Sequence, residues 1–248
     1  MVKNIIQTKI GYKWLTSNMR SMRGNLTWKL GEWKKYSGKL KICKRGLHAS
    51  PTPLDSLEYI YGNRWFIVEY SGNVIKEDDK FVASKMRIVK ELDSKRILIP
   101  FACLCARRCL KNYEKEYPKD FRPRKAIEAA EECIRNPTAK NKGIATRASW
   151  KAQIAADEEF SVKYTTTSAG EAACAGEAAW SAMLSAQSAS RSIDEATKDA
   201  LILESSENTA ARSASASRFS FSKRARNREK KWQNEQLLKL IKMVEKRI

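Results

Sequence analysis

His48 is the residue with the most distinctive chemistry, because it is the single histidine among 248 residues. It lies in an Arg-Gly-Leu-His-Ala run between a predicted strand and a predicted helix, where a side chain is often presented to a ligand. Together with Tyr59 and Glu69 it could supply a general acid–base group and a carboxylate. Three nearby arginines could hold phosphates: Arg20, Arg23 and Arg45. This set of residues suits chemistry at an N-glycosidic bond, since a carboxylate stabilises a cationic sugar.

Two interpretations of this set stay open. In the first, the chain is an enzyme of the glycosylase or ADP-ribosyl-transfer type, which acts on nucleic acid or a nucleotide at His48, Tyr59 and Glu69. In the second, His48 hydrogen-bonds within its own turn, and Glu69 is an exposed strand residue. The two can be told apart because an enzyme needs a concave pocket that holds His48 beside a carboxylate.

No other catalytic signature accompanies His48. The sequence has no glycine-rich phosphate loop, no nucleophile elbow and no histidine pair that could bind a metal. Cys103, Cys105 and Cys109 lie within two helical turns, but Cys-x-Cys-x3-Cys is not a standard zinc spacing. These cysteines are better explained as small buried apolar groups in a reducing compartment. We therefore expect no cofactor and no metal site.

A second set of candidate binding residues lies near the end of the sequence. The pattern from residue 223 to residue 248 predicts a basic amphipathic helix. Its first turns carry the cations Arg224, Arg226, Arg228, Lys230 and Lys231. Cations at the start of a helix oppose the helix dipole, so local helix stability does not explain them. Either they bind an anionic partner such as nucleic acid, or they form a basic entry into an ordinary docking helix.

The formal net charge of +20 is unevenly spread along the chain. Basic residues exceed acidic ones by 10 in residues 1–95, by 6 in residues 96–144 and by 8 in residues 218–248. Residues 145–217, in contrast, carry a net charge of −4. Such a field attracts nucleic acid, nucleotides or an acidic protein. The alternative is a solvated basic surface without a dedicated ligand.

Neither a membrane span nor an export signal is recognisable. No apolar run approaches 18 residues, and the N-terminus lacks the apolar core and cleavage site of a signal peptide. We expect a cytoplasmic protein that does not bind membranes.

The elements that must position the first set of residues are mostly strands. The clearest strands are residues 65–70 and 81–89, with a Ser71–Asn73 turn and an acidic loop at residues 77–79 between them. Three weaker elements are a strand over residues 12–15, a strand over residues 40–43, and a helix over residues 53–60 with Thr52 as its N-cap. We expect a small strand-rich α+β domain over residues 1–95.

Residues 96–248 are expected to form an all-α, alanine-rich helical bundle. Two helices meet at a Tyr117–Asp120 corner, where Asp120 is placed to cap the second helix. At least one of Arg122 and Arg124 should pair with an acidic residue of the preceding helix or of another helix. Small residues dominate from residue 145 to residue 216, and sparse large ones such as Trp150, Met183 and Leu184 would fill the gaps between closely packed helices.

Two family resemblances complete the sequence evidence. The run EKEYPKDFRPRKAIEAA (residues 114–130), the alanine-rich middle and the closing KWQNEQLL (residues 231–238) resemble a bacterial and phage family of putative immunity proteins over about residues 97–244. The first 93 residues resemble a small phage and prophage domain of unknown function, through CKRGLHAS (residues 43–50) and IVKEL (residues 88–92). The resemblances imply a phage or mobile-element conflict protein that acts in immunity, antiviral defence or counter-defence. It would bind a toxin, a defence component or nucleic acid, and its oligomeric state is left open.

Overall fold

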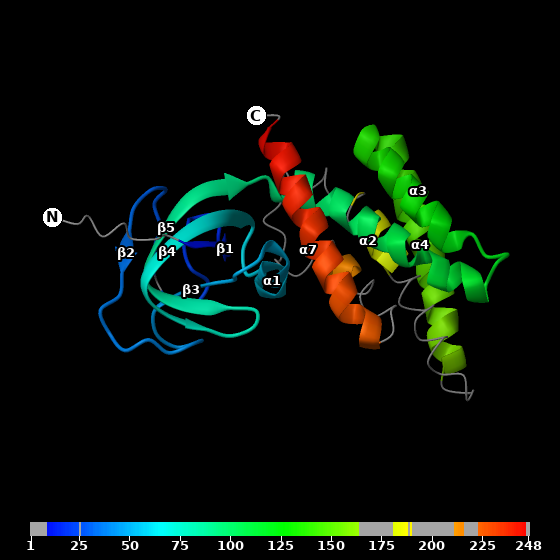
Figure 1. Ribbon diagram of the computed structural model, residues 1–248. Helices are drawn as coiled ribbons and strands as arrows, with labels where there is room; N and C mark the ends of the chain where they lie inside the picture. Colours follow the sequence, from blue (N-terminus) through cyan, green and yellow to red (C-terminus); the bar gives the residue numbers. More distant parts are fainter. Residues whose placement is uncertain are drawn as a thin grey trace. The chain divides into compact units, whose positions relative to one another are not determined.

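The computed structural model describes residues 9–24, 26–163, 181–187, 189, 211–215 and 223–246, without the side chains of residues 159–163, 223 and 224. The chain divides into two compact units, Met1–Ser94 and Lys95–Ile248 (Figure 1). The first unit is built on a sheet and the second on helices, so the α+β module followed by an all-α part is confirmed.

An antiparallel sheet of five strands forms the first unit. The strands are β1 (Lys9–Leu15), β2 (Lys34–Lys35), β3 (Leu47–Ala49), β4 (Arg64–Lys76) and β5 (Phe81–Leu92). The sheet order is β1-β4-β5-β2, and β3 also pairs with β5. Between β3 and β4 lies the short helix α1 (Pro53–Ser56), followed by a 3₁₀ turn at Leu57–Tyr59. The Thr52 hydroxyl accepts the Asp55 N–H at 3.1 Å, which confirms the predicted N-cap.

The two long strands differ from the prediction at one point. Residues 71–73 do not end the strand but form an irregularity inside β4, where Gly72 has a φ of 78° and the Asn73 N–H donates to Ser84 Oγ at 2.9 Å. The strand continues to Lys76 because residues 74–76 find partners on β5, and the chain reverses at the predicted acidic loop. The predicted strand over residues 40–43 is also wrong. Lys41 and Arg45 close a tight turn there, with Cys43 at a φ of 60°.

Aromatic side chains cover one face of this sheet. The rings of Trp14 and Trp65, which are paired across β1 and β4, stack 5.3 Å apart and are nearly parallel. The Trp65 indole donates a hydrogen bond of 3.0 Å to Ser56 Oγ, which ties α1 to the sheet. A separate apolar core includes Leu15, Trp28 and Phe66.

Four helices carry labels in the second unit (Figure 1). They are α2 (Ser94–Glu116), α3 (Arg122–Arg135), α4 (Ala139–Lys163) and α7 (Lys223–Glu245). Residues 181–187 and 211–215 are also helical, and the described residues from 95 onward include no strand. Small residues such as Ala126, Ala130 and Ala145 make up much of the core, which lets the helices pack closely. Met183 and Leu184 are buried as expected, but Trp150 is 63% exposed, so it does not fill a gap in the bundle.

The amphipathic helix predicted near the C-terminus is confirmed as α7. Its buried side includes Leu237 and Ile241, and it also carries two polar groups with partners of their own. Glu229, which is 2% exposed, accepts a hydrogen bond of 2.6 Å from Arg108 of α2, and the Gln233 amide donates to the Ala214 carbonyl at 3.0 Å. The Arg108 guanidinium also lies 4.3 Å from the centre of the Trp232 ring. These contacts fix the rotation of α7 about its own axis.

Candidate functional site

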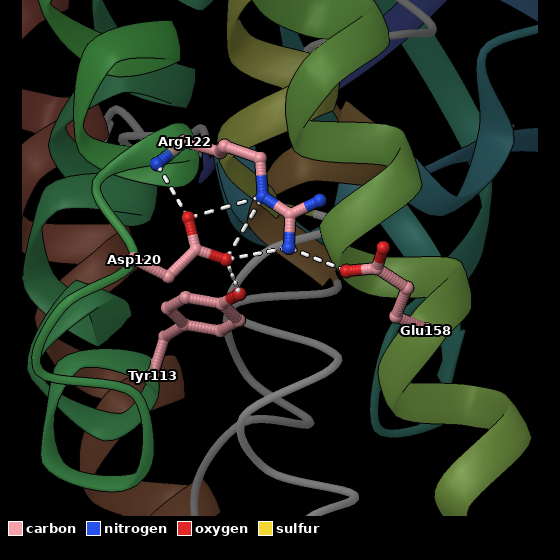
Figure 2. A network of polar contacts seen from close by, with 4 residues as sticks. All are labelled: Tyr113, Asp120, Arg122 and Glu158. Atoms are coloured by element: carbon pink, nitrogen blue, oxygen red, sulfur yellow. Dashed lines mark hydrogen bonds and ion pairs between the residues drawn. The ribbon is translucent and has the colours of Figure 1, made fainter.

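The corner between α2 and α3 is organised by the Asp120 carboxylate (Figure 2). The buried Tyr113 hydroxyl, from the last turns of α2, donates to Asp120 Oδ2 at 2.6 Å. The Arg122 N–H, at the start of α3, donates to Asp120 Oδ1 at 2.9 Å. The Arg122 guanidinium donates to the same carboxylate and reaches across to Glu158 of α4. One carboxylate therefore connects three helices.

The predicted roles of the corner residues are confirmed in outline. Asp120 satisfies the first N–H of α3, although it stands one residue before the N-cap position, which Phe121 occupies without a side-chain bond. Arg124 donates two hydrogen bonds, of 2.7 and 2.8 Å, to the Glu114 carboxylate of α2. This bidentate pair and the Arg122–Glu158 pair bear out the expectation that an arginine here binds an acid of another helix.

The protonation of Asp120 follows from its partners. Burial by itself would raise the pKa of the Asp120 carboxyl, but the hydrogen bonds from Arg122 and Tyr113 outweigh burial and hold that pKa below its ordinary value. The Asp120 contact in turn raises the pKa of the Arg122 guanidinium, so both groups stay charged at neutral pH.

An open groove of about 1170 Å³ lies along this corner, between residues 116–129 and α4. Four cations line it and are exposed, namely Lys119, Lys125, Arg147 and Lys151. None of the four side chains forms an ion pair with another described residue. Three carboxylates also line the groove: Asp120 is bound by Arg122, Glu116 lies 3.6 Å from Lys115, and Glu128 is exposed, so the cations outnumber the carboxylates. The groove therefore presents positive charge outward.

Apolar side chains accompany these cations. Phe121 is 51% exposed and Ile144 is 39% exposed, and both line the groove. Trp150 and Ile154, also exposed, follow Arg147 at i+3 and i+7 and so lie beside it on the surface of α4. Cations interspersed with exposed apolar groups can hold an acidic ligand that also has apolar parts.

The residues predicted to form a catalytic centre each have a different partner. Glu69, on β4, accepts hydrogen bonds from Arg87, the closer of them 2.6 Å long. The Tyr59 hydroxyl donates to Asp79 Oδ2 at 2.5 Å and accepts a bond from Lys80 at 3.3 Å. Burial and the Asp79 hydrogen bond raise the pKa of Tyr59.

His48 lies on β3 opposite Val82, whereas Glu69 lies opposite Arg87. Val82 and Arg87 are five residues apart on β5, roughly 16 Å along an extended strand. No hydrogen bond or ion pair joins any two of His48, Tyr59 and Glu69 in the part of the chain that the structure describes. The enzyme hypothesis would need these three groups to act together.

The predicted anion-binding arginines of the first unit lie on loops. Arg20 pairs with Thr27 in a short bridge after β1, Arg23 is exposed in the same loop, and Arg45 is exposed in the turn before β3. In the second unit, Arg228, Lys230 and Lys231 are exposed on α7 and Arg226 is half-buried. The side chain of Arg224 lies outside the described part.

Lys13 is an unusual residue of the first unit that the sequence analysis missed. It alternates with Gly11 and Leu15 along β1, so its side chain is on the same face of the strand as the buried Leu15. Its ammonium donates to the His48 carbonyl at 2.8 Å and lies 5.4 Å from the centre of the Trp28 ring. Burial lowers the pKa of Lys13 to about 8, and burial together with the Lys13 charge lowers the pKa of His48. The period-2 pattern of β1 was the signal that could have revealed it.

Cys103, Cys105 and Cys109 match their predicted structural role. Cys103, Cys105, Cys109 and Cys133 are buried and unbridged, whereas Cys43 is exposed. Burial raises the pKa of the Cys103 thiol to about 12, which leaves it protonated and unreactive. Cys174 lies outside the described residues. Among the residues that are described, no cluster of three or more His, Cys, Asp or Glu side chains could hold a metal ion.

Comparison with known families identifies both parts of the chain. A model described as a domain of unknown function, DUF7666, matches residues 9–99, and a model described as Imm-5-like putative immunity protein matches residues 89–240. Because the second match covers more than half of the chain, the protein belongs to the Imm-5-like putative immunity protein family. This membership indicates an immunity-type role and confirms both resemblances in their order. No curated protein and no solved structure gives a match.

All of the residues that line the groove lie within the region matched by the immunity family. In the described part of the chain, no helix is both long enough and apolar enough to cross a membrane.

The corner predicts a pH-dependent loss of stability for Asp120→Asn. The folded-state pKa of Asp120 is lowered, so its carboxylate stabilises the fold above the unfolded pKa of about 3.9, and this stabilisation is lost as the pH falls through the lower folded-state pKa. We expect the variant to lose about 1 kcal/mol of unfolding free energy at pH 7 and progressively less below about pH 4. Urea denaturation followed by circular dichroism measures this. Glu128→Gln, at an exposed carboxylate of α3, serves as the control and should change little; an equal loss at every pH would contradict the assignment.

The buried Lys13 also predicts a rise in stability with pH, in the first unit and in a higher pH range than for Asp120. The folded-state pKa is lowered to about 8, so the unfolded chain binds more protons between about pH 8 and pH 10.4, and the wild type should gain stability over Lys13→Met as the pH rises through that interval. Tryptophan fluorescence during urea denaturation at pH 7.5, 8.5 and 9.5 measures the difference. Lys9→Met, at an exposed lysine of the same strand, should show no such trend. A wild-type advantage that stays constant over this range would refute the burial of a charged amine.

Proposed function

We propose that this chain acts as an immunity protein by binding an acidic segment of a partner protein in the groove at the α2–α3 corner. The observation that carries the proposal is the set of four exposed cations, Lys119, Lys125, Arg147 and Lys151, without ion-pair partners among the described residues. A surface that leaves so many like charges uncompensated attracts a ligand of opposite charge and increases the rate of encounter.

The apolar side chains of the groove favour a protein as the ligand. Protein interfaces combine an apolar centre with a polar rim, and their binding energy is concentrated in a few large side chains. Phe121 and Ile144 supply exposed apolar groups inside the groove, and Trp150 supplies one beside it. A partner segment that alternates carboxylates with apolar side chains fits both features, whereas a nucleic acid backbone would use only the cations.

The rigidity of the corner supports this use of the groove. Asp120, Arg122 and Glu158 hold α3 and α4 together at the groove, and Arg124 and Glu114 tie α3 to α2. A surface held in place before binding loses less conformational entropy when the partner docks. The groove can therefore bind its partner without prior rearrangement of the backbone.

Charge reversal at Lys125 and Lys151 tests the electrostatic part of the proposal. A fluorescent twelve-residue peptide rich in glutamate, with phenylalanine and leucine at intervals, is the probe, and anisotropy gives its affinity. We expect Lys125→Glu/Lys151→Glu to weaken binding by roughly tenfold or more, equivalent to about 1.4 kcal/mol. Lys111→Glu/Lys140→Glu, an equal change of charge at exposed lysines that do not line the groove, should change affinity far less.

A second pair of variants tests the apolar contacts of the proposed interaction. Phe121→Ala/Ile144→Ala should weaken the peptide, while Leu104→Ala, at an exposed leucine of α2 away from the groove lining, should not. If a single-stranded oligonucleotide of equal charge displaces the peptide at equal concentration and the apolar variants bind normally, the groove is a general anion site and the proposal of a protein partner fails.

A further inference from the structure

A line of exposed cations runs along the outer side of α7. Its members are Arg228, Lys231, Lys239, Lys242 and Lys246, all exposed, with the single acidic residue Glu235 between them. Steps of three or four residues keep successive members on one side of a helix, and Glu235 bridges the longer interval at the same spacing. From Arg228 to Lys246 the line extends about 27 Å at 1.5 Å per residue.

This line differs from the cluster that the sequence predicted. Arg226 belonged to the predicted cluster, but it is half-buried and lies three residues before the buried Glu229, toward the side of α7 that packs inward. The exposed cations instead continue past Lys231 to Lys246, beyond the first turns of the helix that held the predicted cluster. Folding therefore replaces a compact basic cluster with a linear arrangement of charges.

Helix stability explains only the C-terminal end of the line, because Lys242 lies in the last turn of α7, where positive charge complements the helix dipole. Arg228, Lys231 and Lys239 lie outside the first and last turns, so the dipole does not account for them. Like charges three residues apart, as at Lys239 and Lys242, destabilise a helix slightly. Among the described residues, none of the five cations forms an ion pair.

The apolar side of α7, opposite the line, argues against a membrane surface as the partner. A helix that lies on a membrane surface inserts its apolar face among the lipids. The apolar face of α7 is already used, because Leu237 and Ile241 are 0% and 4% exposed and Glu229 is bound to Arg108. Insertion of α7 into a membrane surface would require this packing to open.

We propose that the outer line of α7 is a nucleic-acid-binding surface that contacts the phosphate backbone. The apolar side chains beside the line are scattered, because Met243 is 53% exposed and Trp232 and Leu238 are half-buried at separate points, and so they do not form the continuous apolar centre typical of a protein interface. A polymer with evenly spaced phosphates can meet each cation of a line in turn, and contacts of this kind carry no base specificity. The surface is distinct from the groove, and this inference does not depend on the acidic-partner proposal.

The test is the salt dependence of binding to labelled 20-base-pair DNA, with single-stranded DNA and RNA of the same length as further arms. Replacing all five cations by glutamine should flatten the log–log salt slope for duplex DNA by up to about 4.5, at about 0.9 per phosphate contact. Glutamine at five exposed lysines elsewhere, Lys29, Lys39, Lys44, Lys111 and Lys140, is the charge-matched control and should leave most of the slope. Circular dichroism checks that both variants retain their helices.

A variant with one added positive charge keeps the test informative even if the five-residue variant fails to fold. Glu235→Lys adds a sixth cation to the line and should tighten binding and steepen the slope by about 0.9. The inference is overturned if the wild type fails to bind at 50 mM salt, if both five-residue variants lose binding equally, or if Glu235→Lys has no effect. Tighter binding to phosphatidylserine vesicles or to the acidic peptide, by the same five cations, would also overturn it.

Discussion

Asp120 accepts hydrogen bonds from α2, from the first turn of α3 and from an arginine that continues to α4. Tyr113 is 1% exposed, and its hydroxyl is satisfied by this carboxylate. The first N–H of α3 has no helical partner of its own, and the same carboxylate satisfies it. Because the corner and α4 are the walls of the groove, the geometry of the groove depends on this one side chain.

Arginine and lysine have different roles in the helical unit: arginines form ion pairs between helices, and lysines supply most of the exposed positive charge. Several short ion pairs between the described helices use arginine, as in Arg107–Glu131, Arg108–Glu229 and Arg124–Glu114. The planar guanidinium can bind a carboxylate through two parallel hydrogen bonds, which suits it to fixed positions between helices. Most carboxylates at these positions are thereby neutralised, and lysines supply most of the charge on the two basic surfaces. The internal pairing thus creates the external positive field.

In the first unit, the irregularity in β4 shows where the local sequence pattern fails to predict the strand that forms. Alternation of residue types indicates strands at residues 65–70 and 81–89, and both are found. The Ser-Gly-Asn run at residues 71–73 has the composition of a turn, yet β5 offers partners beyond it, so the sheet absorbs the run as an irregularity. Pairing across strands is not local, and a single-strand pattern therefore cannot decide where a long hairpin reverses. The same reason explains why Glu69 binds Arg87, which only the register of β4 and β5 brings opposite to it.

The sequence by itself determined the order of the two parts, the ends of α2 and α3 at the corner, and the N-cap at Thr52, since these follow from proline, capping residues and the period of apolar positions. It also indicated that Asp120 would cap the second helix and that at least one of Arg122 and Arg124 would pair with an acidic residue. Only the tertiary structure decided which charged side chains form ion pairs and which stay exposed without one. That outcome depends on distances between residues far apart in the chain, such as Arg108 and Glu229, or Arg122 and Glu158. The tertiary structure also placed the Lys13 amine against the His48 carbonyl. The burial of a lysine amine depends on the neighbouring strands and loops that surround it.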